Sequence, residues 1–444
     1  MKIPQKPPVW ASHVQNLLGK KRFVEWVTSR EGNPKDYLHW DDFRFQAPPA
    51  GLTTEEWWII QKYRRSSSSR ALPGEGMDRR PFWFVPTDYV QDWLHRFDRQ
   101  TGSLDAVPTA VNSEPNQQAY LMSAVLEEAF ASSVLEGAVA TREQAKDMIR
   151  NGRPPRDRSE RMIMNNYLTM QRLRQLKSEP LSSELLLNMH RLITEGTLDK
   201  SDAAGRLRRS DEPVELADMI DGTTYFTPPT VEALPERLAA LTAFANEKTP
   251  DYYLHPVLRA IILHFWLAYE HPFVDGNGRT ARALFYWSML KSGYPQFEYI
   301  SISHFIRRAS VQYSRAFLEV ETDDNDFTYF IHFHLRVIDL AMRQLLEHIQ
   351  AKRSELENLE TSLRSLQGFN HRQQALLMHA LKKPQARYTI QAHKNSHGIT
   401  YQTARTDLLG LAKANLLEQS KSGKAFIFKP APNLERKLKA TLPA

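Results

Sequence analysis

The sequence predicts a mainly α-helical protein that contains one β-hairpin. Apolar residues recur at close to helical spacing between Tyr252 and Glu270, and they indicate a buried helix. A capping box, Thr141-Arg-Glu-Gln144, indicates the start of another helix. Only residues 215–227 resemble strand, with Asp221-Gly222 as the hairpin turn. These observations favour a helical core with a hairpin flap, flanked by an N-terminal domain and a C-terminal winged helix.

Length and composition indicate a globular chain with several domains. With 444 residues, the chain has room for two to four domains. It contains no cysteine, which excludes disulfides and thiolate zinc sites and is consistent with a reducing cytoplasm. The net charge of +7 permits a nucleic-acid partner without indicating one.

No segment of the sequence is suited to membrane insertion. Residues 1–8 lack the apolar stretch of a signal peptide. A run of about 18 apolar residues, as a membrane-spanning helix requires, does not occur in the sequence. We therefore expect a cytoplasmic protein with no membrane partner.

Residues 1–112 are predicted to form an aromatic-rich N-terminal domain. The segment Tyr37–Phe45, the pair Trp57-Trp58 and the segment Pro81–Phe84 concentrate aromatic side chains. Residues 66–69 and 72–76 are expected to form loops, because they are rich in Ser, Gly and Pro. The region could recognise a target or form a dimer, but a small domain packed on the core, with its aromatics as anchors, is the favoured interpretation.

Residues 113–340 are predicted to form the helical core. Helices are expected over 114–130, 158–176 and 182–194. After the buried helix 252–270, another helix begins near Arg279 and directs an apolar stripe inward. His264 is interpreted as a core histidine.

Residues 341–368 are predicted to form one long amphipathic helix. Its apolar residues keep heptad spacing, with Lys352 at one apolar position, and are Leu345, Ile349, Leu356, Leu359, Leu363 and Leu366. The helix could pair in a homodimer, or it could pack on the core of its own chain, which we favour.

Residues 369–444 are predicted to form a winged helix-turn-helix. Helices are expected over 372–379, after a cap at Thr389, and over 403–412, followed by a strand, a wing and a second strand. In such modules the third helix can enter the DNA major groove. The residues that would then face DNA or its phosphates are Gln402, Thr403, Arg405, Thr406, Lys421 and Lys424. A wing that binds protein or forms a dimer is an equally open alternative.

The strongest functional signal is the segment His271-Pro-Phe-Val-Asp-Gly-Asn-Gly-Arg-Thr-Ala-Arg282. Pro272 and the Gly276-Asn277-Gly278 triplet break the preceding helix and form a tight turn. A glycine-rich loop that leads into a helix start presents free backbone amides and the positive end of the helix dipole to an anion. The segment therefore predicts a polyphosphate site.

The charged residues of this segment fit the same interpretation. Arg279 and Arg282 are three residues apart, so they share one helix face, and guanidinium groups suit phosphate oxygens. Asp275 is an oxygen ligand of the kind that Mg²⁺ prefers. His271 is a candidate base because an imidazole takes up a proton near neutral pH.

The segment matches the signature of the Fic (filamentation-induced-by-cAMP) family, His-x-Phe-x-Asp/Glu-Gly-Asn-Gly-Arg-x-x-Arg, at every fixed position. The chain resembles this family over roughly residues 115–340. The resemblance implies transfer of AMP from ATP, with Mg²⁺, to a Tyr, Thr or Ser hydroxyl of a target protein or of the chain itself.

The resemblance also implies roles for individual residues. His271 would be the catalytic base, and Asp275 the metal ligand. Gly205–Arg208 and Thr224–Pro229 resemble the flap that docks the substrate. Arg206, Arg208 and Arg209 are interpreted as a solvated charge run, and a contact with the target is the alternative because the flap is close in sequence. The residues expected to bind the nucleotide or the substrate are Gly276, Asn277, Gly278, Arg279, Arg282, Thr224, Tyr225, Phe226 and Tyr313.

A second motif, Ser132-Ser-Val-Leu-Glu136-Gly137, resembles the inhibitory pattern of the family. In relatives with this helix before the core, the glutamate occupies the second arginine of the signature. Here the pair would be Glu136 and Arg282, and the carboxylate would exclude the γ-phosphate. Glu136 as an ordinary surface carboxylate is the alternative.

Several other functions remain open at this stage. The family resemblance also covers proteins that remove AMP from a modified target, and members that transfer UMP, GMP or phosphocholine. A regulator in which the core senses nucleotide while the winged helix binds DNA, and the toxin of a toxin–antitoxin pair, are further alternatives.

Overall fold

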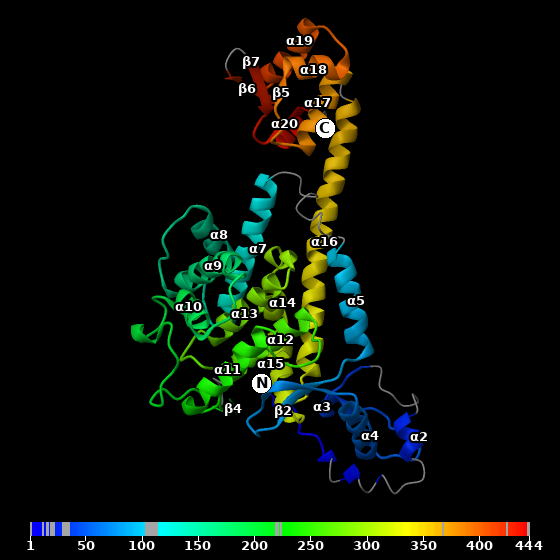
Figure 1. Cartoon of the computed structure of the whole chain (residues 1–444), viewed down its shortest axis with the longest axis vertical. Helices are drawn as coiled ribbons and strands as arrows, with labels where there is room; N and C mark the ends of the chain where they lie inside the picture. The colour runs from blue at the N-terminus through cyan, green and yellow to red at the C-terminus, as the bar shows by residue number, and fades with distance from the viewer. Residues whose placement is uncertain are drawn as a thin grey trace. The chain divides into compact units, whose positions relative to one another are not determined.

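The computed structural model describes residues 2–10, 13–14, 17, 23–28, 36–102, 114–217, 222, 224–365, 368–422 and 425–441 (Figure 1). The chain divides into two compact units. Unit 1 comprises Met1–Gly102 and Ser123–Met342, and unit 2 comprises Ser103–Met122 and Arg343–Ala444. The predicted turn residue Asp221, the heptad residue Leu366 and the wing residue Lys424 lie outside the described residues, as do the side chains of Lys352, Leu356, Leu359 and Leu363.

The fold is mainly helical, as predicted, and two antiparallel helices form the centre of unit 1. Helix α12 (Pro256–Glu270) and helix α13 (Asn277–Lys291) bury nearly all of their side chains. The predicted start of the first helix at Tyr252 is wrong. His255 caps α12 and Pro256 occupies its first turn, because proline lacks the N–H that an interior position would require.

Further helices surround this pair. The capping box at Thr141 is confirmed, since its hydroxyl accepts from the Gln144 amide and the Gln144 side chain accepts from the Thr141 amide. The other helices of the core are α7 (Glu114–Leu135), α8 (Arg142–Arg150), α9 (Arg158–Leu176), α10 (Ser183–Thr194), α11 (Leu234–Ala245), α14 (Ile302–Arg308), α15 (Ser310–Thr322) and α16 (Thr328–Ser365), with short 3₁₀ turns at Ser201–Ala203, Val231–Ala233 and Pro295–Glu298.

The predicted flap is a small antiparallel hairpin. Strand β3 (Leu216–Ala217) pairs with strand β4 (Thr224–Phe226), and Leu216 lies opposite Phe226.

The N-terminal region contains a hairpin that the sequence did not predict. Its elements are α2 (Phe23–Thr28), α3 (Trp40–Phe43), α4 (Thr54–Ser67), β1 (Arg70–Glu75), β2 (Pro81–Phe84) and α5 (Asp88–Gly102). The prediction of a loop at 72–76 is wrong for the residues of β1, which pairs with β2. Pro73 is tolerated because this sheet has only two strands, so one edge of β1 needs no donor.

Buried charges join the N-terminal region to the core within unit 1. Lys62 lies 2.8 Å from Asp323, and both side chains are inaccessible to solvent. The Tyr37 hydroxyl donates to Asp326 (2.6 Å), and Arg65 donates to the Tyr329 hydroxyl (2.7 Å). Met1–Gly102 belongs to the same compact unit as the core, and the predicted domain boundary near residue 112 stays a prediction.

Many aromatic side chains of this region are buried, as the favoured interpretation expects of anchors, although Phe45 is 76% exposed. Trp40, Phe43, Trp57 and Trp58 form one cluster, and the rings of Phe43 and Trp57 lie 4.3 Å apart. Aromatic pairs of this kind contribute about 0.5–1.5 kcal/mol beyond their buried area.

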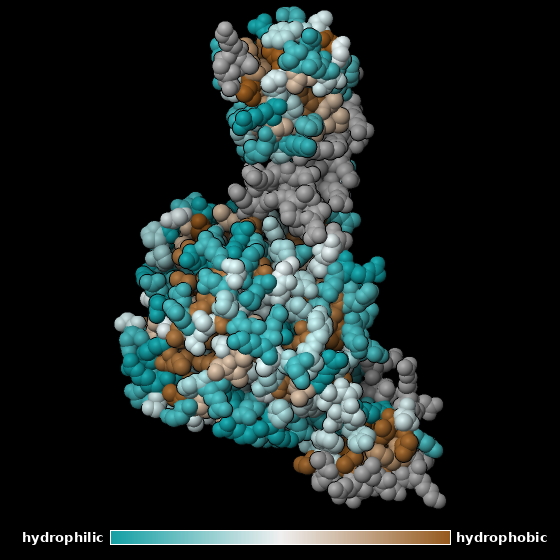
Figure 2. All heavy atoms as spheres, viewed as in Figure 1, coloured by the Kyte–Doolittle hydropathy of each residue, from teal (hydrophilic) through white to brown (hydrophobic). Residues whose placement is uncertain are grey.

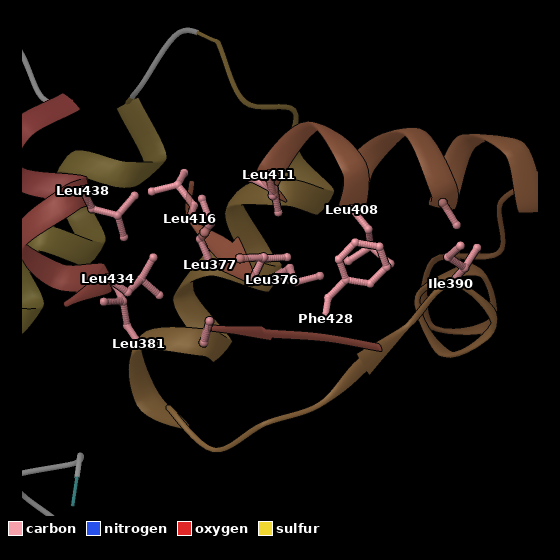
Figure 3. Packing of buried hydrophobic residues seen from close by; sticks show 13 residues of the cluster. Leu376, Leu377, Leu381, Ile390, Leu408, Leu411, Leu416, Phe428, Leu434 and Leu438 are labelled. Atoms are coloured by element: carbon pink, nitrogen blue, oxygen red, sulfur yellow. The ribbon is translucent and has the colours of Figure 1, made fainter. Parts of the chain in front are cut away.

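The C-terminal part of the chain has its own hydrophobic core, formed mainly by leucine side chains around Phe428 (Figure 3). Three strands form a sheet in the order β5-β7-β6, of which the short β5 was not predicted. The elements are α17 (His371–Lys382), β5 (Tyr388–Thr389), α18 (Ile390–His397), α19 (Tyr401–Lys413), β6 (Leu417–Ser422), β7 (Ala425–Pro430) and α20 (Leu434–Thr441).

Hydrophilic residues cover much of the face of the molecule that Figure 2 shows. Among the described helices, none combines the length and the apolar composition that crossing a bilayer requires.

Replacing Lys62 with alanine is expected to destabilise unit 1 by about 3–5 kcal/mol, because it leaves the Asp323 carboxylate buried without its cation. Arg96→Ala removes an exposed ion pair with Asp92 and should cost about 0.5 kcal/mol or less. Thermal unfolding followed by circular dichroism compares the two variants. Equal melting temperatures for Lys62→Ala and the parent protein would contradict the structural role of this ion pair.

Candidate active site

His271 lies at the start of the short loop that joins α12 to α13. His271 has a left-handed backbone (φ 46°, ψ 52°) and ends α12. Both polar atoms of the Asn277 side chain bond the backbone of Phe273, with Nδ2 donating to the carbonyl (2.8 Å) and Oδ1 accepting from the amide (3.0 Å). This side chain closes the loop, and the phosphate contact predicted for it stays a prediction.

Gly276 and Gly278 are required by the geometry around this loop. Gly276 is left-handed (φ 86°) and precedes α13, a conformation that favours glycine. A Cβ on Gly278 would lie 2.1 Å from Oε1 of Glu136. The missing side chain at Gly278 thus leaves space for the Glu136 carboxylate directly above the start of α13.

The end of helix α7 binds the guanidinium group of Arg282. The Arg282 Nε atom donates to the Ser132 hydroxyl (2.8 Å), and Nη2 donates to the Ser132 carbonyl (2.9 Å) and to Glu136 Oε1 (2.8 Å). Arg282 is 1% exposed. The structure therefore brings together the two residues that the sequence paired, Glu136 and Arg282, and the motif residue Ser132 joins them.

Gly137 ends this segment with a left-handed backbone (φ 88°). Helix α7 is itself fastened to the core by the buried Glu128, whose carboxylate accepts from the hydroxyls of Tyr286 (2.8 Å) and Ser301 (2.9 Å). These contacts hold Glu136 in place over Gly278.

Charge determines the ionisation of Glu136. Burial alone would raise the pKa of this carboxyl, but Arg282 and Arg279 outweigh that effect and hold the pKa below its ordinary value. Glu136 is therefore an anion at neutral pH and occupies the place of an anionic ligand beside the two arginines.

One ring nitrogen of His271, Nε2, forms no hydrogen bond within the part of the chain that the structure describes. Its Nδ1 atom lies 3.1 Å from the Ala268 carbonyl, an acceptor, so Nδ1 carries the proton and Nε2 has an open lone pair. Burial lowers the pKa of His271, while the Ala268 contact and Glu136 oppose that shift. The neutral imidazole is thus the dominant form at pH 7, as a general base requires.

Arg208 anchors the loop, a role that the sequence did not reveal. We expected Arg206, Arg208 and Arg209 to be a solvated run, and this is wrong for Arg208, which is 6% exposed. Its Nε atom donates to the His271 carbonyl (2.9 Å), its amide donates to the Pro272 carbonyl (2.9 Å), and Nη2 donates to the Pro229 carbonyl.

His190 is a second residue that the sequence did not single out. Its Nδ1 accepts from the Gly205 amide (3.0 Å), so its protonated Nε2 donates to the Asp275 carbonyl (2.9 Å). The ring stacks on Phe273 with centroids 3.7 Å apart. Burial lowers the pKa of His190 to about 4, so it stays neutral and positions the loop. An isolated histidine within a helix gives no signal of such a contact.

The Asp275 side chain is 39% exposed and lies among cations. Its Oδ1 atom accepts from the Gly276 amide (2.5 Å) and lies 3.5 Å from Arg279, and Oδ2 lies 3.6 Å from Arg158. Within the described residues, no group of three metal-ligating side chains of His, Cys, Asp or Glu exists. The site fits a Mg²⁺ ion that takes one carboxylate and receives its other ligands from phosphates and water.

A cavity of about 460 Å³ opens in front of His271. The flap, the end of α12 and helix α15 line it, and Tyr225, Phe226 and Tyr313 are among its walls, together with Glu136 and Gly278. Thr224 is exposed and does not line this cavity, unlike its neighbours Tyr225 and Phe226 on β4. Tyr313 also lies 3.0 Å from His264, which is buried as predicted.

The pKa of His271 should fall further when Glu136 is replaced by glycine, because the carboxylate stabilises the imidazolium. Since the pKa is already depressed, the ring protonates only at acidic pH, and the variant should need a still lower pH. Titration of the His271 ring signals by NMR measures this, with the exposed Glu143→Ala as a matched control. A midpoint that is higher in Glu136→Gly than in the parent would overturn the assigned interaction.

Comparison with known proteins gives a concordant result. Residues 180–289 match the model of the Fic/DOC family. The chain is 26% identical over 211 residues to the "Protein adenylyltransferase Fic" of Nematostella vectensis, which covers 46% of this chain and 46% of that protein. It is 35% identical over 117 residues to the "Protein adenylyltransferase fic-1" of Caenorhabditis elegans, covering 26% of this chain and 21% of that protein.

The chain therefore spans less than half the length of the curated relatives that it matches. Among solved structures, a Fic family protein from Desulfovibrio desulfuricans G20 superposes with a TM-score of 0.50 and 18% identity, over 76% of this chain and 96% of that one. This likeness concerns the fold alone. Residues 180–289 thus match the Fic/DOC family, and the chain is similar in fold to a solved Fic family protein.

Proposed function

We propose that the chain is a protein adenylyltransferase that moves AMP from ATP to a hydroxyl side chain of a protein, and that Glu136 inhibits it. The contact of Glu136 with Arg282 above Gly278, beside the free Nε2 of His271, carries this proposal. The names of the curated relatives support the same reaction class.

The loop and the two arginines form the nucleotide site of this proposal. The amide of Gly278 stands at the positive end of the α13 dipole, where phosphate oxygens are stabilised, whereas the amide of Gly276 already donates to Asp275. Arg279 is fully buried and its Nε has no hydrogen-bond partner among the described residues. A buried guanidinium with an unused donor favours an anionic ligand.

In the proposed reaction, Nε2 of His271 takes the proton from a Ser, Thr or Tyr hydroxyl. The resulting oxygen forms a bond to the α-phosphorus as the bond to the β-phosphate oxygen breaks, and pyrophosphate leaves. Positioning and charge stabilisation dominate such transfers. The cavity between the flap and α15 would hold the target segment, with its hydroxyl near His271.

Asp275 would hold Mg²⁺ in this scheme, and Arg279 and Arg282 would orient the phosphates. When bound, Mg²⁺ neutralises negative charge on the phosphate oxygens. His190 and Arg208 would keep Asp275 and His271 in position, because they bond the carbonyls of these two residues.

Inhibition follows from competition between two anions for one arginine. Arg282 already donates to Glu136 and Ser132, so a γ-phosphate must displace the carboxylate to bind there. A hydrogen bond to a charged group contributes about 1.5–3 kcal/mol, which corresponds to about 10- to 150-fold in binding.

Glu136→Gly should raise the rate of AMP transfer about 10- to 150-fold, because Arg282 becomes available to the triphosphate. Transfer from ATP labelled at the α-phosphate measures this, for the chain itself and for protein targets. Glu143→Ala, which removes an exposed carboxylate on α8, should leave the rate unchanged. Equal rates for Glu136→Gly and the parent protein would remove Glu136 from the inhibitory role.

Adding His271→Ala to the Glu136→Gly protein should lower the transfer rate by about 10²–10⁴, since the general base is lost. Intact-mass measurement after incubation with Mg²⁺ and each nucleoside triphosphate identifies both the reaction and the donor. Nucleotide binding, followed by calorimetry, should be preserved. An adenylyl group gained as fast by the double variant would refute the assignment of His271.

A second candidate function is removal of AMP from a modified protein. Glu136 and His271 line the same cavity, so the carboxylate stands where it could orient an attacking water molecule. One purified AMP-modified substrate, assayed in both directions with the parent protein and Glu136→Gly, separates transfer from removal.

A further inference from the structure

Positive charge is concentrated in the C-terminal part of the chain. Residues 369–441 contain thirteen Lys or Arg and three Asp or Glu, a net charge of +10. The whole chain carries only +7, so the remaining residues together carry −3. Although the net charge of the full sequence is small, residues 369–441 form a strongly basic region of a kind that attracts polyanions.

On the first three helices of this region, no exposed carboxylate neutralises the positive charge. Asp407 is the only acidic residue between 369 and 417, and it is 3% exposed. It lies 2.8 Å from Arg372 and 3.2 Å from His393, and its pKa is lowered because these hydrogen bonds outweigh burial. Glu418 lies opposite Lys429 on the paired strands β6 and β7.

Helices α18 and α19 are joined by a tight turn of defined geometry. Gly398 ends α18 with a left-handed backbone (φ 61°), and the Thr400 hydroxyl caps α19 by accepting from the Thr403 amide. Ala404, Leu408 and Leu411 direct one face of α19 into the core of the unit. Two short helices joined in this way have the geometry of a helix-turn-helix.

The opposite face of α19 is exposed and polar. Tyr401 is 51% exposed, and Gln402, Arg405 and Thr406 are also exposed. No hydrogen bond or ion pair among the described residues uses the side chains of Gln402 and Arg405. Positions 402, 405 and 406 share one helix face. In the major groove, a Gln side chain can form two hydrogen bonds to adenine, and an Arg side chain can form two to guanine.

The β6–β7 hairpin supplies a second basic element. Lys421 is exposed on β6, with its ammonium 5.4 Å from the ring of Phe426, which packs against the core of the unit. Arg387, also exposed, lies next to β5, the third strand of the same sheet. These residues are suited to phosphate contacts, because each is a cation held by a folded element.

We propose that residues 369–441 bind duplex DNA, with the exposed face of α19 in the major groove and basic residues such as Lys421 on the phosphates. The order of three helices followed by a β-hairpin is that of winged helix-turn-helix modules, which dock in this manner. DNA binding is distinct from AMP transfer, since none of its residues lies in the cavity of His271.

Fluorescence anisotropy with the full chain and a labelled 30-base-pair duplex of mixed sequence tests the proposal. The logarithm of the association constant should fall linearly with the logarithm of salt concentration. Each phosphate contact contributes about −0.9 to the slope of this plot, so three contacts predict a slope of about −2.7 or steeper. A duplex enriched by selection from a random library should bind more tightly than the mixed sequence.

Two matched variants locate the interface. Arg405→Ala should weaken binding to the selected duplex about 5- to 150-fold, as expected for one lost base contact. Arg436→Ala removes an equally exposed helical arginine on α20 and should change affinity less than twofold. Circular dichroism checks that both variants stay folded.

Three outcomes would overturn the proposal. The first is an absence of binding to duplex DNA at low salt. The second is an equal loss of affinity in Arg405→Ala and Arg436→Ala, which would indicate a general attraction of charge without a docking face. The third is competition by polyglutamate as effective as that by unlabelled duplex DNA, which would indicate an acidic protein partner.

Discussion

The tight turn between α12 and α13 is the constraint on which the site depends. Its left-handed backbone at His271 and Gly276 reverses the chain within a few residues, and the Asn277 side chain closes the loop on Phe273. Because α12 and α13 are almost completely buried, their packing fixes both ends of the loop that joins them. A rigid hairpin of helices therefore holds an imidazole, a carboxylate and two arginines in one small region.

The remainder of unit 1 supports that turn from several sides. Arg208 and His190 bond the carbonyls of His271 and Asp275, and both residues belong to segments that precede the loop by more than 60 residues. Glu128 fastens α7 so that Glu136 rests over Gly278. A buried set of charges around Lys62 and Asp323 attaches the N-terminal region to the same core. The placement of the few polar groups of the candidate site thus depends on contacts spread over most of the unit.

The two functional proposals rest on different physical properties. In the core, the proposed inhibition depends on single charges that are buried and closely paired, such as the Glu136 carboxylate at 2.8 Å from Arg282. In the C-terminal unit, a large excess of exposed positive charge matters, and individual pairs contribute little. If both proposals hold, the chain combines inhibition by one buried carboxylate with DNA attraction by a basic surface.

The sequence by itself determined the helical class and the turn at 271–282, because each depends on local spacing or on a long motif, whereas the pairing of Glu136 with Arg282 was implied by the resemblance to the Fic family. It also specified the caps at Thr141 and Thr389, which are local hydrogen bonds. Only the tertiary structure decided the burial of Arg208, the role of His190 and the β1–β2 hairpin. Those features come from contacts between residues far apart in the chain, and no local pattern encodes them.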